Sequence, residues 1–301
     1  MAVFFSIALL VITLFSLPAA ALSTEVAHLR PSLSIYLDNK GVGLRHPEGV
    51  ACSGSTLVVG DTENGRLVRY TIEGKSVKGG TEIKIPQLGS PTRVQIDSKG
   101  DIFALDGKER RIVHLGPDGA FKGYVAAEGA PSQSSLVPRS FKIGPDDALY
   151  ILDVFSGRVL VVGADGKYQR QIDFPADYGF FSDVAVDAKG TVIVVDSIRA
   201  TVWAAVGKAT TFSPLGRPVK EYMTFPASLA ADRRGIIYIT DEYGGDVGIL
   251  ARDGSFLGKQ LGMGWNEGLL SFPTQICVDD QEEVFIADRG NSRVQVFTLA
   301  K

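Results

Sequence analysis

Hydrophobic and polar residues alternate along much of the chain with the period of two that is typical of half-buried β-strands. Val94 and Ile96 flank a polar residue in this way. By contrast, Leu57–Val59 and Val192–Val195 are continuous apolar runs, which suit strands that are buried on both faces. Glycine-containing segments such as Pro117–Gly119 separate the runs and predict hairpin turns. The pattern therefore predicts an all-β fold.

One longer pattern returns six times along the chain. Each copy has a proline or small residue, an alternating strand, a turn, and an apolar run that ends in aspartate. Successive aspartates lie 45, 47, 43, 45 and 47 residues apart; they are Asp61, Asp106, Asp153, Asp196, Asp241 and Asp288. Each copy predicts three strands and a weaker fourth one, which together make a four-stranded antiparallel blade. A lone blade exposes both faces, so the six copies predict a closed ring of six blades.

The last copy reads FPTQICVDDQEEVFIADRGNSRVQVF. It holds a proline-led strand ending in Val-Asp, an apolar strand ending in Asp, and an Asn-x-Arg-Val-x-Val-Phe segment. In these elements the chain resembles the NHL-repeat family, from about residue 45 to residue 299. The resemblance implies a six-bladed β-propeller. It implies little about function, because such rings host many activities.

The two chain ends are predicted to meet in one blade. The last copy stops after three strands at Phe297, and the upstream segment Ser32–Leu37 has no blade of its own. We expect this segment to supply the outermost strand of the last blade, which leaves no unpaired edge there. Cys52 and Cys277 fall on the innermost strands of the first and last copies, where they can face each other. The alternatives are a disulfide, in an oxidising compartment, and two buried thiols that act as small hydrophobes.

The N-terminal segment predicts export. Ala2–Leu17 is almost wholly apolar, Pro18 ends the run, and Ala19–Ala21 matches a small-residue cleavage site. We therefore expect a signal peptide over residues 1–21, a single propeller domain over 22–301, and a periplasmic or secreted location. An uncleaved signal anchor is the alternative, because the apolar run is nearly long enough to span a bilayer. No membrane contact is expected beyond this segment.

Composition and charge exclude several classes of function. Lys and Arg total 31 against 34 Asp and Glu, so the net charge of −3 lacks the basic excess that nucleic-acid binding needs. Three histidines and two cysteines, widely spread, exclude zinc fingers and iron–sulfur sites. The chain has no P-loop, no G-x-S-x-G elbow and no Ser-His-Asp order. We expect no cofactor.

The repeated Asp-x4-Arg pairs are interpreted as structural, because a catalytic pair would not recur in four blades. The carboxylate can instead hold the turn by charge-assisted hydrogen bonds. Blades four and five lack the arginine, and the run Asp241–Asp246 gathers three carboxylates within six residues. This run could hold a hard cation such as calcium, although a solvated acidic loop is the better interpretation.

Candidate binding residues come from loops that should open on one face of the ring. Phe155, Tyr243 and Trp265 are expected to be exposed there and to form a contact surface. Phe181, Phe225 and Phe272, which precede their innermost strands, are expected to plug the space between blades.

A second set of candidates surrounds the mouth of the central channel. These residues form a polar ring of mixed charge that suits a small polar ligand or a chain terminus, or a hydrated channel lining; those expected to bind are Arg93, Arg139, Asp183 and Gln275.

These features predict a non-catalytic extracytoplasmic scaffold that binds a protein, a peptide or a polysaccharide on one propeller face. The alternative is a calcium-dependent hydrolase of the lactonase type at the channel mouth, with Glu48 and Asp183 among the metal ligands. The histidines His28, His46 and His114 are too dispersed along the repeat to converge on one metal.

Overall fold

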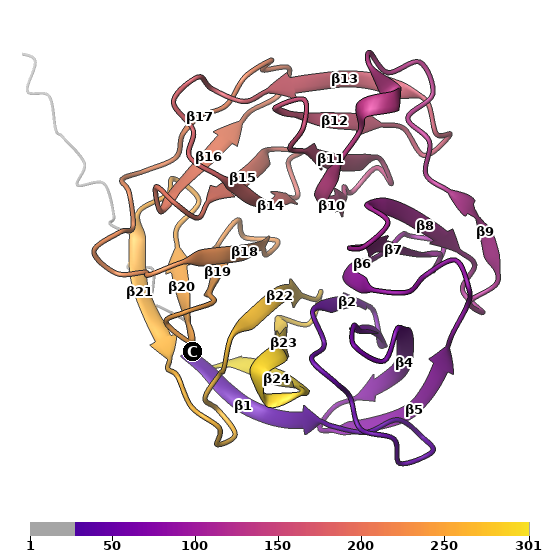
Figure 1. Cartoon of the computed structure of the whole chain (residues 1–301). Coiled ribbons are helices and arrows are strands. Elements are labelled where there is room, and N and C mark those ends of the chain that lie inside the picture. Colours follow the sequence, from indigo (N-terminus) through magenta and orange to yellow (C-terminus); the bar gives the residue numbers. More distant parts are fainter. Residues whose placement is uncertain (1–27, 301) are drawn as a thin grey trace, which may run out of the picture.

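The chain folds into six four-stranded antiparallel sheets, one for each copy of the repeat, and the six sheets surround a central axis (Figure 1). A computed structural model describes residues 28–300. The predicted six-bladed propeller is therefore confirmed. The expected signal peptide, residues 1–21, lies outside the described residues, so the domain boundaries 22–301 stay a prediction.

The strands follow the order of the chain from the axis outward in the first five blades. Blades one to three are β2 (Gly49–Ser53), β3 (Thr56–Asp61), β4 (Arg66–Glu73) and β5 (Ser76–Ile83); β6 (Pro91–Ile96), β7 (Ile102–Asp106), β8 (Arg111–Leu115) and β9 (Phe121–Tyr124); and β10 (Pro138–Ile143), β11 (Leu149–Asp153), β12 (Arg158–Val162) and β13 (Tyr168–Asp173). Blades four and five are β14 (Phe181–Val186), β15 (Val192–Asp196), β16 (Thr201–Ala205) and β17 (Ser213–Pro214); and β18 (Pro226–Ala231), β19 (Ile237–Asp241), β20 (Asp246–Leu250) and β21 (Phe256–Leu261).

The last blade is completed by the start of the chain. It contains β22 (Pro273–Val278), β23 (Glu283–Asp288) and β24 (Arg293–Ala300), and β1 (His28–Ile35) pairs with β24 as its outermost strand. Figure 1 shows the indigo β1 beside the yellow β24. The predicted closure is confirmed, although the strand begins at His28 and ends at Ile35, rather than spanning residues 32–37.

Helical structure is confined to two single turns within residues 28–300, Gln133–Ser135 (η1) and Arg289–Asn291 (η2). Across this described range, no helix has both the length and the apolar character needed to cross a bilayer.

The core consists of six hydrophobic clusters, each built from two neighbouring blades. The run Val192–Val195 shows why continuous apolar strands suit this fold. Val192 and Val194 pack toward blade three, whereas Ile193 and Val195 pack toward blade five. Successive residues of a strand face opposite sides, so a middle strand must be apolar at every position.

The seam between blades six and one carries a covalent link as well. Cys52 of β2 and Cys277 of β22 form a disulfide with a Cα–Cα distance of 6.1 Å, across a sequence separation of 225 residues. Both sulfurs lie in the hydrophobic cluster that joins these two blades.

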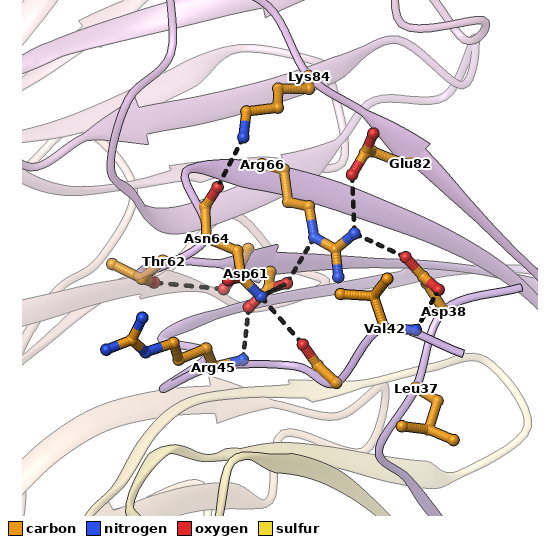
Figure 2. Close-up of polar contacts among 12 residues, drawn as sticks. Leu37, Asp38, Val42, Arg45, Asp61, Thr62, Asn64, Arg66, Glu82 and Lys84 are labelled. Carbon is orange, nitrogen blue, oxygen red and sulfur yellow. Dashed lines mark hydrogen bonds and ion pairs between the residues drawn. The ribbon is translucent and has the colours of Figure 1, made fainter. Parts of the chain in front are cut away.

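The repeat aspartates tie the loop entering each blade to the turn after its second strand. Asp61 accepts hydrogen bonds from the Arg45 backbone N–H at 2.7 Å and from Arg66 Nε at 2.7 Å. Arg66 also donates to Asp38 and Glu82, so three carboxylates surround one buried guanidinium (Figure 2). Equivalent pairs join Asp153 to Arg158 and Asp288 to Arg293.

Blade two departs from the expected pairing. Asp106 accepts from the backbone N–H groups of Gly89, Lys108 and Glu109. The Arg111 guanidinium instead lies over the Tyr124 ring, 4.2 Å from its centroid. In blades four and five, the aspartates likewise accept hydrogen bonds from backbone N–H groups of the entry loop and the turn. The donors to Asp196 are Gly179, Phe180, Ile198 and Arg199. The donors to Asp241 are Thr224, Phe225 and Gly244. The aspartate is therefore structural with or without an arginine.

Candidate functional site

The loops that enter the blades and the turns after the repeat aspartates open onto the same side of the ring, here called the loop face. A cavity of about 520 Å³ lies there at the end of the central channel, here called the mouth. Its walls come from entry loops, first strands and turns of all six blades. The charged side chains that line it are Glu48, Arg93, Lys108, Arg110, Arg139, Glu242 and Arg289. The volume falls in the range of small-molecule sites.

Beneath the mouth, one repeat position recurs near the start of each innermost strand; it is the third strand residue in blades two to six and the first strand residue in blade one. These six residues, here called the inner ring, are Gly49, Arg93, Ser140, Asp183, Ser228 and Gln275. Asp183 accepts from the hydroxyl of Ser140 and, at 2.5 Å, from the hydroxyl of Ser228. It also accepts from the Leu229 backbone N–H at 3.0 Å. One carboxylate therefore joins blades three, four and five.

Gln275 makes the corresponding link from the last blade. Its Oε1 accepts from the backbone N–H groups of Val50 and Val94, at 3.1 and 3.0 Å, and its Nε2 donates to the Val94 carbonyl at 3.0 Å. Gln275 and Asp183 are only 3% and 4% exposed, and neither lines the mouth. The structure thus places these two sequence candidates in the framework that supports the mouth.

Arg93 and Arg139 do line the mouth. Arg93 is buried, and within residues 28–300 its Nε has no hydrogen-bond partner; the nearest carboxylate oxygen, on Asp183, is 3.9 Å away. Arg139 is exposed toward the cavity, and its guanidinium lies 5.4 Å from the centroid of the Phe180 ring. Burial within the depression and the nearby charge of Arg93 lower the pKa of Arg139.

The three aromatic candidates are exposed on the loop face, as expected. Phe155 is 70% exposed, Tyr243 52% and Trp265 83%. They form an arc over blades three to six with two further exposed side chains, Ile198 and Met263. We call these five residues the hydrophobic arc.

The expected interblade plugs behave differently from one another. Phe181 is fully buried and Phe225 is half-buried, but Phe272 is exposed, so the expectation is wrong for Phe272. Phe272 has a φ of 47°, and its ring lies beside the Arg289 guanidinium, 5.8 Å away, at the edge of the mouth. At this positive φ, the Phe272 side chain lies on the surface and not between the blades.

The acidic candidates do not fit a calcium ion. Oδ2 of Asp183 already accepts two hydrogen bonds, and Arg93 approaches Oδ1. Glu48 lies 4.0 Å from Arg289, so each proposed ligand faces a guanidinium that would repel a cation. Within residues 28–300, no three His, Cys, Asp or Glu side chains converge to hold a metal.

The three carboxylates of the acidic run Asp241–Asp246 have different partners. Asp241 binds backbone N–H groups, Glu242 pairs with Arg289 at 2.7 Å, and Asp246 pairs with Lys259 at 2.7 Å. Burial raises the pKa of Asp246, and this effect outweighs the contact with Lys259, which acts to lower the pKa. The three carboxylates serve three separate contacts.

Several mouth residues escaped the sequence reasoning. Lys108, Arg110 and Arg289 all occupy turns after repeat aspartates, so their place in the repeat could have identified them. Lys142 does not line the mouth. It lies two residues beyond Ser140 on the innermost strand β10 and is half-buried, and burial lowers its pKa.

Comparison with known proteins locates the repeat in the last blade. The family model for the NHL repeat matches residues 270–297, which confirms the resemblance for that blade. Human E3 ubiquitin-protein ligase TRIM32 is 34% identical over 116 residues, or 38% of this chain. The match spans only 16% of the length of that relative.

Two solved structures superpose on most of the chain. Virginiamycin B lyase from Staphylococcus aureus has a TM-score of 0.63 and 14% identity, covering 91% of this chain and 99% of that one. A gluconolactonase from Xanthomonas campestris has a TM-score of 0.64 and 15% identity, covering 91% and 90%. At these identities the likeness shows the fold alone.

Proposed function

The protein is a six-bladed propeller with an NHL repeat in its last blade, and from this premise we propose that it is a non-catalytic extracytoplasmic scaffold. It binds a polypeptide segment on its loop face. The observation that carries this proposal is the hydrophobic arc, whose five large apolar side chains are exposed on one face of four adjoining blades.

Apolar side chains gathered in this way are typical of interaction surfaces. The equivalent turns of blades one and two carry Glu63 and Lys108, so the arc is confined to one side of the face. Tyr243 is supported by rings on either side, with centroid distances of 4.9 Å to Phe225 and 6.2 Å to Phe272. A supported aromatic side chain loses little conformational entropy when a partner binds.

A polypeptide is favoured over a polysaccharide because NHL repeats commonly mediate protein interactions. Location outside the cytoplasm is supported by the Cys52–Cys277 disulfide, since such bonds persist in oxidising compartments. The apolar segment Ala2–Leu17 supports the same location from sequence.

The test is to select peptides from a display library on the immobilised mature chain and to measure their affinities for variants. Trp265→Ala and Phe155→Ala should weaken binding at least tenfold if these side chains are hot spots. The matched control is Val206→Ala, because Val206 is also 70% exposed but lies in the turn after β16, on the opposite face.

Unchanged affinity in both aromatic variants would remove the proposed surface. Binding of oligosaccharides in place of peptides, lost in the same variants, would assign the face to a polysaccharide.

An enzyme is the second candidate, because folds of this shape include a lyase and a gluconolactonase. The contacts of Glu48 and Asp183 weigh against the calcium-dependent form of this candidate. A calcium-dependent rise in melting temperature that Asp183→Asn abolishes would favour it over the scaffold.

A further inference from the structure

The mouth has an uneven distribution of charge. Five cationic side chains line it, against the two carboxylates of Glu48 and Glu242. Both carboxylates face Arg289, at 4.0 and 2.7 Å. The remaining cations, Arg93, Lys108, Arg110 and Arg139, come from blades two and three. The chain as a whole carries a net charge of −3, so this concentration of positive charge is local.

Within residues 28–300, Lys108, Arg110 and Arg139 form no ion pair; the pairs there involve other residues. All three are exposed, and each contributes to the wall of the same cavity. Like charges held together repel one another unless an anion lies between them. Burial and the charge of Arg93 lower the pKa of Arg139, although the carboxylates of Asp183, Glu48 and Glu242 act to raise it.

Arg93 supplies an independent observation that points to a ligand. Its side chain is more than nine-tenths buried, and within residues 28–300 its Nε–H has no acceptor at hydrogen-bond distance; Oδ1 of Asp183 lies 3.9 Å away. One of its terminal nitrogens, Nη1, donates to the Thr92 carbonyl at 2.9 Å, which fixes the guanidinium in the wall of the mouth. A buried donor left without an acceptor costs free energy, so an acceptor entering from the cavity would be stabilised.

We propose that the mouth is a carboxylate-binding site, in which an organic anion lies between Arg93 and Arg139, with Lys108 and Arg110 adding to the attraction. The planar guanidinium fork matches the two oxygens of a carboxylate. Phe180 lies beside the Arg139 guanidinium and limits its orientations. The carboxylate belongs either to a small organic acid or to the C-terminus of a peptide.

This site is separate from the hydrophobic arc, so it stands even if the arc binds nothing. The probe is succinate, titrated into the full mature chain by calorimetry at constant ionic strength, with succinamide as its uncharged analogue. We expect saturable binding of succinate and none of succinamide. Arg139→Gln should weaken succinate binding at least about tenfold, because a charge-assisted hydrogen bond is lost.

Arg139 is exposed, so this variant should fold, and its melting curve verifies that it does. The double variant Lys108→Gln/Arg110→Gln should weaken binding by a smaller factor. The matched control is Arg252→Gln, an exposed arginine in the turn after β20 on the opposite face. It should leave the affinity unchanged.

A second arm distinguishes the source of the carboxylate. N-acetyl-phenylalanyl-alanine is tested as the free acid and as the C-terminal amide, in competition with succinate. Competition by the free acid alone supports a chain end; no competition, with succinate still bound, supports a small organic acid.

Three outcomes would overturn the proposal. These are no saturable succinate binding, binding that Arg139→Gln leaves intact, and inorganic phosphate that binds more tightly than succinate. Trp265→Ala should not alter succinate affinity, so failure of this site and failure of the arc are read from different variants.

Discussion

Gln275 of blade six spans blade one and binds both backbone groups of Val94 in blade two. It accepts from the Val94 N–H and donates to the Val94 carbonyl, each at 3.0 Å. This pair of bonds copies the exchange between two antiparallel strands. Blade one has Gly49 in the inner ring, where a Cβ would lie 2.7 Å from Cγ2 of Val94, so the glycine allows blade two to approach blade one closely.

Gln275→Ala should therefore destabilise the ring. The substitution leaves the Val94 N–H and carbonyl without the Gln275 amide, and we expect a loss of about 2 kcal/mol in the free energy of unfolding. Urea denaturation, monitored by circular dichroism, measures this loss in the free energy of unfolding. Gln281→Ala, at an exposed glutamine on the opposite face, serves as the control. Equal midpoints for the two variants would show that the amide does not hold the blades together.

Removing the disulfide should also lower stability. The Cys52–Cys277 bond joins residues 225 positions apart, so it restricts the unfolded chain strongly. The double variant Cys52→Ala/Cys277→Ala is expected to lose about 2–4 kcal/mol. Unfolding midpoints with and without a reductant test this. A reductant should shift the wild-type midpoint and leave that of the double variant unmoved; any other pattern would argue against the bond.

Asp106 gives a prediction about pH. Burial acts to raise its pKa, but hydrogen bonds from the backbone of Gly89, Glu109 and Lys108 outweigh burial and lower the pKa below its ordinary value. A carboxylate with a lowered pKa stabilises the fold above its ordinary pKa and loses this contribution as the pH falls through the folded value. Asp106→Asn should thus be less stable by about 2 kcal/mol at pH 7.

The difference in stability between Asp106→Asn and the wild type should begin to shrink below about pH 4, where the unfolded chain takes up the proton, and should vanish as the pH falls through the lower folded pKa. Urea midpoints measured from pH 7 down to pH 2.5 provide the test. Glu109→Gln, in the same turn and exposed, should follow the wild type throughout. A gap that stays constant with pH would contradict the role given to the ionised carboxylate.

The two tryptophans should respond differently to a quencher. Trp203 is 5% exposed and Trp265 is 83% exposed, so acrylamide should quench one accessible and one protected fraction of the fluorescence. Trp265→Phe should leave only the protected fraction. A peptide bound to the arc should shield Trp265. A single class of tryptophan in the unbound wild type would contradict the exposure on which the arc depends.

The repeat made the fold predictable because each copy carries the same alternation, turns and terminal aspartate. Blade closure followed from counting strands, even though β1 begins before the expected segment. The site was less accessible to sequence reasoning. Asp183 and Gln275 occupy polar positions of the inner ring, and the sequence does not show that their side chains are already hydrogen-bonded to other blades, which leaves them unable to bind a ligand.

Arg93 and Arg139 were predicted from the sequence, but the other cations of the mouth were missed for a related physical reason. Lys108 and Arg110 are ordinary turn residues along the sequence, and their common charge matters only where the ring brings them near Arg93 and Arg139. For Phe272 the repeat position predicted burial, and the side chain is exposed. It shares its repeat position with the buried Phe181, yet its positive φ accompanies an exposed ring.

The pairing of His28 with Ala300 decides how the molecule can be attached to anything else. Strand β24 starts at the loop face and ends on the far side, and β1 runs back antiparallel to it. The described chain therefore begins and ends on the side of the ring away from the mouth. A propeller held at a bilayer by its first residues would present the arc outward, and a purification tag at either terminus would leave it unobstructed.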